Sequence, residues 1–144
     1  MTVTRQQVIA CARGYLGTPY HHQGRLKGVG VDCIGLAIAV AADLGLVVAA
    51  QYPIDYGRDP DGSLPATLDR DCTLLADATY QEADLLLIRN LKGPPRHCGL
   101  VGLLNGEFTL IHAWDKRGMV VEHDLTEWWQ QRIVSVYQLP GIEQ

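Results

Sequence analysis

Long apolar runs and blocks of basic residues are both missing from this sequence. No segment approaches the roughly 20 consecutive apolar residues that a membrane-spanning helix needs, so we expect no membrane insertion. The net charge is −4 and lysine and arginine do not cluster, which argues against a nucleic-acid partner. The first seven residues are polar and lack the apolar core of a signal peptide. We therefore expect the protein in the cytoplasm of the producing cell, unless another route carries it out.

Charged residues are also scarce, at 19% of the chain, whereas 47% of the residues are hydrophobic. This balance is typical of a packed globular domain. A length of 144 residues is enough for one domain with a hydrophobic core and too short for two, and the sequence has no internal repeat or low-complexity segment. We therefore expect a single domain over residues 1–144.

Cysteine occurs four times, at positions 11, 33, 72 and 98. Two disulfides are possible by count, but a chain of this size without a secretion signal does not need them. Cys11 falls in a helical pattern and Cys98 in an apolar strand, so both are expected to be small buried side chains. Only Cys33 has neighbours that would activate a thiol.

Cys33 lies at the predicted start of a helix, directly after Asp32 and a glycine-rich loop at residues 24–30. Apolar residues recur at three- and four-residue spacing after it, and Gly45 follows as a stop signal near the predicted end at Leu46. Asp32 is a favourable N-cap residue. A thiol at a helix N-terminus loses its proton more easily, and the thiolate is the nucleophile. The pattern favours covalent catalysis, although by itself it also fits a buried cysteine behind a capping aspartate.

Two histidines offer the base that such a nucleophile needs. Residues 96–104 and 109–114 each have strand character, and they carry His97 and His112 respectively. The Asn105-Gly106 pair between them is a strong hairpin signal. In this hairpin both histidines lie far from the turn, at the same end of the sheet. Each histidine alone also fits a hydrogen-bonded position in the core.

The remaining segments predict helices followed by an antiparallel sheet, which is an α+β fold. A Thr4-x-x-Gln7 capping box opens the first helix, and a second short helix is expected over residues 64–76. Residues 51–63 are rich in Asp, Gly and Pro and predict a long surface loop. Further strands are expected over residues 84–89, 119–122 and 133–139, with a helical turn within 124–131.

Several short motifs together resemble the NlpC-type cell-wall peptidases, which are compact papain-like cysteine hydrolases. They follow the family's order over roughly residues 4–115: Gly17-Thr18-Pro19-Tyr20, Asp32-Cys33-Ile34-Gly35-Leu36, Ala83-Asp84-Leu85, His97-Cys98-Gly99-Leu100-Val101 and Ile111-His112-Ala113. The resemblance implies a papain-like α+β fold, with N-terminal helices packed on an antiparallel sheet. The glycine-rich insertion before Cys33 is similar to the branch encoded in phage tail and gene-transfer-agent clusters.

The resemblance also implies a role for particular side chains. Cys33 would be the nucleophile, His97 the general base, and His112 the polar residue that orients His97. Tyr20 would help to hold the thiolate or the developing oxyanion. The implied substrate is a peptidoglycan stem peptide, cut between γ-D-glutamate and the diamino acid. One departure is Ile34, where the family usually has serine, so the substrate contacts beside the nucleophile are expected to differ.

A metal site is the main chemical alternative. Cys33, His97, Cys98 and His112 are of zinc-ligand type, but adjacent strand residues such as His97 and Cys98 point to opposite faces of a sheet. We therefore expect no metal and no cofactor. The other histidines are expected at the surface, at His21, His22 and His123.

Other functions stay open at this point. One is a structural tail-tip or baseplate protein that keeps the papain-like fold and docks through residues 51–63 or the part from Trp128 onward. Another is a cysteine-dependent acyltransferase. For a hydrolase, the expected partners are the stem peptide and the hub or tail-tip proteins of a phage-like particle. Arg89, Lys92 and Arg96 are either a solvated rim or a site that attracts the peptide's carboxylates.

Overall fold

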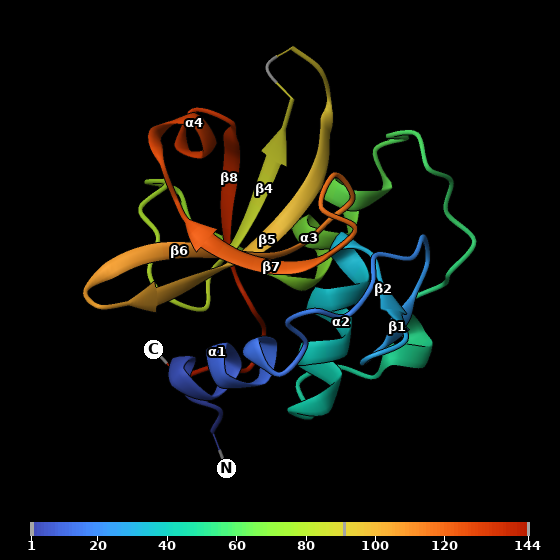
Figure 1. The fold of residues 1–144 in the computed structure, drawn as a ribbon, viewed down its shortest axis with the longest axis horizontal. Coiled ribbons are helices and arrows are strands. Elements are labelled where there is room, and N and C mark those ends of the chain that lie inside the picture. Colours follow the sequence, from blue (N-terminus) through green and yellow to red (C-terminus); the bar gives the residue numbers. More distant parts are fainter. Residues whose placement is uncertain (1, 91, 144) are drawn as a thin grey trace.

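The computed structural model describes residues 2–90 and 92–143 of the chain. Helices α1 (Arg5–Arg13) and α2 (Cys33–Asp43) lie on one side of a twisted antiparallel sheet (Figure 1). The two ends of the described chain lie side by side, because Val3 and Ile142 form a parallel bridge. This arrangement confirms the expected α+β fold, with N-terminal helices packed on an antiparallel sheet. Within the described residues, no helix has the length and apolar character needed to cross a membrane.

Helix α1 begins at the predicted capping box. The Thr4 hydroxyl accepts a 3.1 Å hydrogen bond from the Gln7 amide, and the Gln7 side chain accepts a 2.8 Å bond from the Thr4 amide. These bonds satisfy donors that the first turn of a helix leaves free. Arg5, the first residue of the helix, donates a 2.8 Å hydrogen bond to the buried carboxylate of Asp84, directly before the strand at Leu85–Arg89. The ion pair anchors the first turn of α1 to the sheet.

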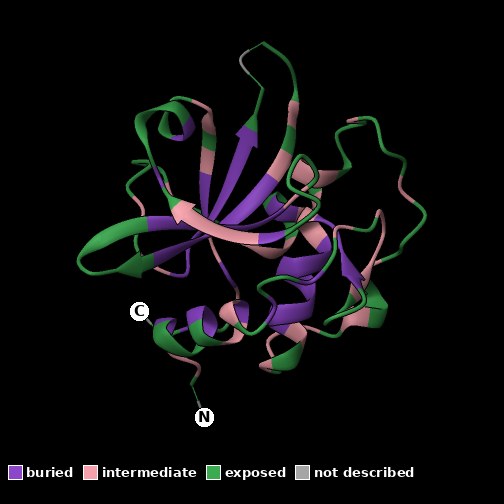
Figure 2. Ribbon diagram, viewed as in Figure 1, coloured by how far each residue is buried: buried purple, intermediate pink, exposed green. Residues whose placement is uncertain are grey.

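Helix α2 begins at Cys33, as predicted. Asp32 caps it by accepting a 2.8 Å hydrogen bond from the Gly35 amide. Every residue from 35 to 41 is buried, so the helix lies inside the domain and not on its surface (Figure 2). It ends at Asp43, before the predicted end at Leu46, because Gly45 adopts a left-handed conformation with φ of 74°.

The main sheet has the strand order β3-β8-β4-β5-β6-β7, and all its pairings are antiparallel. Its strands are β3 (Thr73–Leu74), β4 (Leu85–Arg89), β5 (Pro95–Leu104), β6 (Glu107–Trp114), β7 (Met119–Asp124) and β8 (Ile133–Gln138). A separate hairpin of β1 (Arg25–Leu26) and β2 (Gly30–Val31) lies just before α2. The strands predicted near residues 84–89, 119–122 and 133–139 are thereby confirmed.

Both faces of the sheet are buried, which explains the continuous apolar character of β4. Alternate residues such as Leu85 and Leu87 pack in the core that contains α1 and α2. The residues between them, Leu86 and Ile88, pack in a second core with Trp129 of helix α4 (Glu127–Gln130). A strand that is covered on both sides needs no polar alternation.

The β5–β6 hairpin opens at the end far from its turn. Asn105 and Gly106 have φ of 53° and 81°, as a tight type I′ turn requires. The strands pair as far as Leu100 opposite Ile111. Beyond that point β5 continues along β4, whereas β6 continues along β7. The strands diverge at the end that carries the two predicted histidines.

The prediction of a helix over residues 64–76 is wrong in its second half. Helix α3 spans Ser63–Asp71, and Cys72 is extended with φ of −115° and ψ of 163°. Thr73 and Leu74 then pair with β8 at the edge of the sheet. Pairing with a strand more than 60 residues away decides the conformation here, and local helix propensity does not.

The predicted loop before α3 is present. After the short 3-10 helix η1 (Ala49–Gln51), residues 52–62 run along the surface and are mostly exposed (Figure 2). The Arg25 guanidinium of β1 donates hydrogen bonds to the carbonyls of Tyr52 and Pro53, the latter at 3.0 Å. These bonds hold the start of the loop against the β1–β2 hairpin.

Candidate active site

Cys33 is half-buried at the first position of α2, where the helix meets β5. A hydrogen bond from the Cys98 thiol holds the pKa of Cys33 well below its usual value. Burial of Cys33 raises this pKa, whereas a hydrogen bond and the charge of His97 lower it further. The same hydrogen bond and burial raise the pKa of Cys98 well above its usual value. Cys33 is therefore the more acidic thiol of the pair, and Cys98 is its hydrogen-bond donor. All four cysteines, at positions 11, 33, 72 and 98, are free thiols.

His97 and His112 meet across the opening of the β5–β6 hairpin. Nε2 of His97 lies 2.6 Å from Nδ1 of His112, within hydrogen-bond distance. Since Nε2 of His97 is used in this contact, Nδ1 is the nitrogen that remains for Cys33. The three residues thus form a continuous series from the Cys33 thiol to a buried imidazole.

A third histidine extends the series. Nε2 of His112 lies 2.8 Å from Nε2 of His123 on β7, and Nδ1 of His123 lies 2.9 Å from the carbonyl oxygen of Asp124. The expectation of a surface position for His123 is wrong, since its side chain is half-buried against His112. The predicted strand 119–122 ended two residues before the end of β7 at Asp124, and extending its alternation from Val121 would have placed His123 on the His112 face.

His112 is held neutral by its surroundings. It is fully buried, with its ring stacked 5.5 Å from that of Trp114 and in edge-to-face contact at 5.0 Å with that of Trp129. Burial lowers the pKa of His112 to about 2, and a proton on His97 or His123 would act in the same direction by charge repulsion. A neutral imidazole can orient His97 by hydrogen bonding without competing for its proton.

Gly99 makes room for this contact. A Cβ atom on Gly99 would lie 2.9 Å from Cβ of His112 and 2.7 Å from Cδ1 of Leu110. Side chains do not tolerate such distances, so His112 can approach β5 only because residue 99 has no side chain. Gly35 has a similar role in α2, where a Cβ would collide with the carbonyl oxygen of Gly24.

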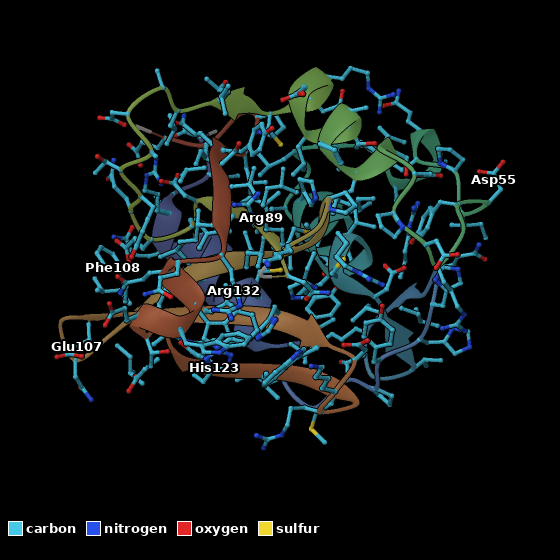
Figure 3. The ribbon with its side chains drawn as sticks, turned by 90° about the horizontal axis from the view of Figure 1, so that it is seen from above. Asp55, Arg89, Glu107, Phe108, His123 and Arg132 are labelled. Carbon is cyan, nitrogen blue, oxygen red and sulfur yellow. The ribbon has the colours of Figure 1, made fainter. Side chains whose placement is uncertain are left out.

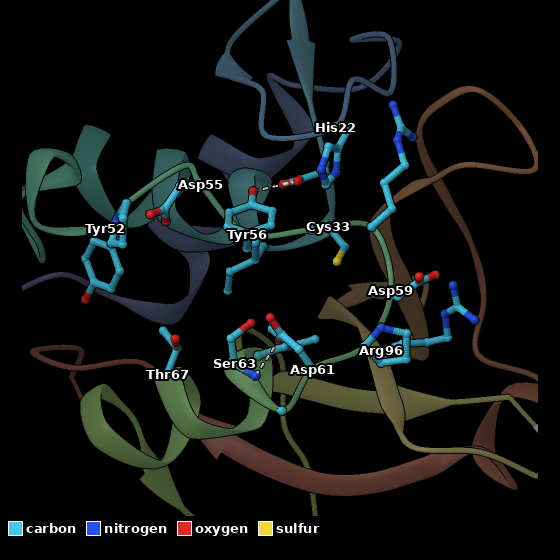
Figure 4. A pocket seen from close by; sticks show the side chains of 18 of the residues that line it. His22, Cys33, Tyr52, Asp55, Tyr56, Asp59, Asp61, Ser63, Thr67 and Arg96 are labelled. Carbon is cyan, nitrogen blue, oxygen red and sulfur yellow. Dashed lines mark hydrogen bonds between the residues drawn. The ribbon is translucent and has the colours of Figure 1, made fainter.

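A cavity of about 350 Å³ opens in front of Cys33, whose sulfur points into it (Figure 4). Ile34 and Ile38 of α2 line one part, and Tyr20 lines the same cavity. Burial and the nearby Cys33 charge raise the pKa of Tyr20, so its hydroxyl remains a donor. The cavity gives an extended substrate access to the sulfur.

Loop 52–62 forms the outer wall of the cavity and brings charged residues to it. Acidic and basic side chains both line the space, namely Asp55, Asp59, Asp61, Arg25, Arg58, Arg70 and Arg96. Tyr56 of the loop donates a 2.6 Å hydrogen bond to Asp32 (Figure 4). The mixture of charges suits a substrate that carries both carboxylates and an ammonium group.

The structure thus brings Cys33, His97 and His112 together, with Tyr20 at the same cavity. His21 is exposed as expected, whereas His22 lines the cavity. Of the predicted cationic residues, Arg96 lines the cavity and Arg89 is exposed. Among residues 2–90 and 92–143, no cluster of His, Cys, Asp or Glu has an arrangement that would hold a metal ion.

Known structures share this fold. An NlpC/P60 family protein from Bacillus cereus superposes with a TM-score of 0.69 and 20% identity, over 97% of this chain and 41% of the other. The NlpC/p60 domain of the peptidoglycan hydrolase SagA gives 0.62 and 20%, over 95% of this chain and 100% of that domain. An N-acetylmuramoyl-L-alanine amidase from Bacteroides uniformis gives 0.63 and 13%, over 96% and 99%.

These similarities place the chain in the papain-like NlpC/P60 fold, as expected. The chain spans about two-fifths of the Bacillus cereus protein and the whole length of the SagA domain. By sequence, no protein-family model and no curated protein matches the chain.

Proposed function

We propose that this chain is a cysteine peptidase of the NlpC type that hydrolyses peptidoglycan stem peptides. The observation that carries the proposal is the site itself: a low-pKa thiol at a helix N-terminus, beside a histidine that a buried histidine orients, facing an open cavity. Each part is needed for nucleophilic catalysis, and none is needed for folding alone. The named activities of the SagA domain and the amidase support the same substrate class.

In the proposed mechanism, His97 carries out each proton transfer. Nδ1 of His97 takes the proton of Cys33, and the thiolate attacks the carbonyl carbon of the scissile amide. The negative charge moves to the carbonyl oxygen, where the backbone N–H of Cys33 and the Tyr20 hydroxyl are the candidate donors. His97 then protonates the leaving amine, which leaves an acyl group bonded to the sulfur. Water, deprotonated by His97, releases the acid and restores the thiol.

For the bond cut, we propose the amide between γ-D-glutamate and the diamino acid. The stem peptide carries carboxylates on both sides of this bond and a free amine on the diamino acid. Arg58 and Arg96 can receive the carboxylates, and Asp59 or Asp61 the amine. Ile34 gives this cavity an apolar wall beside the sulfur, where the family usually has a hydroxyl.

Digestion of purified peptidoglycan tests the proposal. We expect the wild-type protein to release fragments with a new amine on the diamino acid, identified by mass, and Cys33→Ser to release none while remaining folded. His97→Ala should be as inactive as Cys33→Ser, whereas His112→Gln should keep part of the activity.

Products cut after muramic acid would instead indicate an amidase. Transfer of the acyl group to an added amine, without hydrolysis, would indicate an acyltransferase. No reaction from the folded protein would favour a structural role.

We also propose that the chain works as a component of a phage-like tail or gene-transfer agent that helps it to pass the cell wall. The glycine-rich segment 24–30 before Cys33 supports this placement by its similarity to that branch. The net charge of −4 gives no attraction to an anionic wall, so a hub or tail-tip partner would have to position the enzyme. Copurification with released particles at a fixed copy number is expected. Recovery only from the soluble lysate would remove the tail assignment and leave the hydrolase proposal unaffected.

A further inference from the structure

His123 is the member of the histidine series that the mechanism above does not use. It lies on β7 and projects toward α4, where its ring packs 5.1 Å from that of Trp129 (Figure 3). Its Nε2 contacts His112 at 2.8 Å and its Nδ1 contacts the Asp124 carbonyl at 2.9 Å. The side chain therefore connects the His97–His112 pair to the backbone of β7.

When the three rings are neutral, the Asp124 carbonyl sets the direction of every hydrogen bond in this series. A carbonyl oxygen only accepts, so Nδ1 of His123 carries a proton. In a neutral ring the other nitrogen is then an acceptor, and His112 must donate to it from Nε2. Neutral His112 consequently accepts at Nδ1, so His97 donates from Nε2. One fixed acceptor thus determines the tautomers of all three rings.

This order leaves Nδ1 of neutral His97 unprotonated, on the side of the ring that remains for Cys33. A general base needs this tautomer, because it must accept the thiol proton. The contact with His112 alone does not select this tautomer of His97. A neutral imidazole has one donor and one acceptor, so the His97–His112 bond forms equally well in either direction. The carbonyl reached through His123 removes this ambiguity.

We propose that His123 is a positioning residue that fixes His97 in the tautomer with a free Nδ1 facing Cys33. The inference rests on the proposed cysteine-hydrolase chemistry, and it does not depend on which amide is cut. His123 acts through His112 and touches no reacting atom. Loss of His123 should therefore slow the chemical step and leave substrate binding unchanged.

The tautomers are read directly from ¹⁵N chemical shifts of the histidine rings, in protein carrying Cys33→Ala so that no ion pair forms. We expect the proton on Nε2 of His97, on Nε2 of His112 and on Nδ1 of His123. A proton on Nδ1 of His97 in this protein would overturn the proposal before any variant of His123 is made.

Variants at position 123 then test the dependence. His123→Glu supplies an acceptor, His123→Phe an aromatic ring without hydrogen bonds, and His123→Lys a donor. We expect Glu to keep the His97 tautomer, Phe to give a mixture and Lys to reverse it. Met119→Lys, exposed on the same strand, controls for the added charge.

In the proteins with Cys33 intact, kcat should fall least for Glu and most for Lys, by roughly 10² to 10⁴ as for a triad histidine in the wrong tautomer. KM should change little. One His97 tautomer shared by all three variants, or equal kcat losses for Glu and Phe, would show that His123 only packs and would overturn the proposal. Tautomers that follow the prediction in proteins that do not cleave peptidoglycan would support the positioning role and reject the proposed substrate.

Discussion

The Tyr56 hydroxyl donates a 2.6 Å hydrogen bond to Oδ2 of Asp32, the residue directly before Cys33. The same carboxylate accepts 2.8 Å bonds from the amides of Gly35 and Gln23. Burial, together with the bond to Asp32, raises the pKa of Tyr56, so its hydroxyl stays protonated and remains a donor. One buried carboxylate thus joins the start of α2 to loop 52–62, which forms the wall of the cavity.

Replacing Tyr56 by Phe should release this wall. A hydrogen bond to a charged group contributes about 1.5–3 kcal/mol, so we expect a stability loss within that range and faster proteolytic cleavage within residues 52–62. Limited proteolysis with mass analysis measures the effect. Asp55→Asn, an exposed change on the same loop, is the matched control and should leave the cleavage rate unchanged. Equal rates for Tyr56→Phe and the wild type would mean that other contacts hold the loop.

Cys98 should control the reactivity of Cys33. Replacement of Cys98 by Val removes the thiol donor at similar volume, and we expect the pKa of Cys33 to rise, because the hydrogen bond that favours the thiolate is lost. Alkylation of Cys33 by iodoacetamide should therefore slow at neutral pH and recover in alkali. Cys98→Ser keeps a donor and should shift the profile less. An unchanged profile for Cys98→Val would assign the low pKa to His97 and the helix N-terminus.

Substitution of Gly99 by Ala should disrupt the contact between His97 and His112. The added Cβ would overlap His112 and Leu110, which must move, at a cost of about 1–3 kcal/mol in unfolding free energy. Because His112 moves, hydrolysis should fall more than stability alone explains. Gly93→Ala is the control, since a Cβ there meets no atom within 4 Å. Chemical denaturation and peptidoglycan digestion measure the two effects. Full activity of the Gly99→Ala protein would show that the histidine contact tolerates displacement.

The stability of the protein should fall as the pH decreases below about 6.5, the ordinary pKa of an unfolded histidine. In the native state burial lowers the pKa of His112 to about 2. Between these values the unfolded chain binds a proton that the native protein excludes, so stability increases with pH across this window. For one such group the limiting slope is about 1.4 kcal/mol per pH unit.

Urea unfolding of the wild type and of His112→Gln, between about pH 5 and 7, isolates this contribution. The variant cannot bind the proton at position 112 and should show a shallower slope. Parallel slopes would mean that His112 is protonated in the native protein, contrary to its burial between two tryptophans.

Local sequence determined the parts of the site that depend on near neighbours. Asp32 caps α2 within a single turn, so the start of that helix and the position of Cys33 follow from adjacent residues. The hairpin is equally local. Asn105-Gly106 fixes the turn, and antiparallel pairing on either side of it brings His97 and His112 to the same end of the hairpin.

The tertiary structure decided what lies between these local units. Divergence of β5 and β6 creates the space in which the histidines meet, and it follows from pairing with β4 and β7. The thiol contact of Cys98 and the bond from Tyr56 each join segments that are distant in sequence. No local pattern marks them, because each residue by itself fits an ordinary buried or exposed position.

The predicted helix is absent over residues 72–76 because contacts with a distant segment decide the conformation there as well. Its residues have adequate helix propensity, and distant pairing with β8 overrides it. Sequence alone thus determined the helix that begins at Cys33 and the histidine hairpin, since backbone capping and turn geometry act over a few residues. Packing of the sheet decided which side chains surround the thiol and in which direction their protons point, since those contacts form only when distant strands and α2 come together.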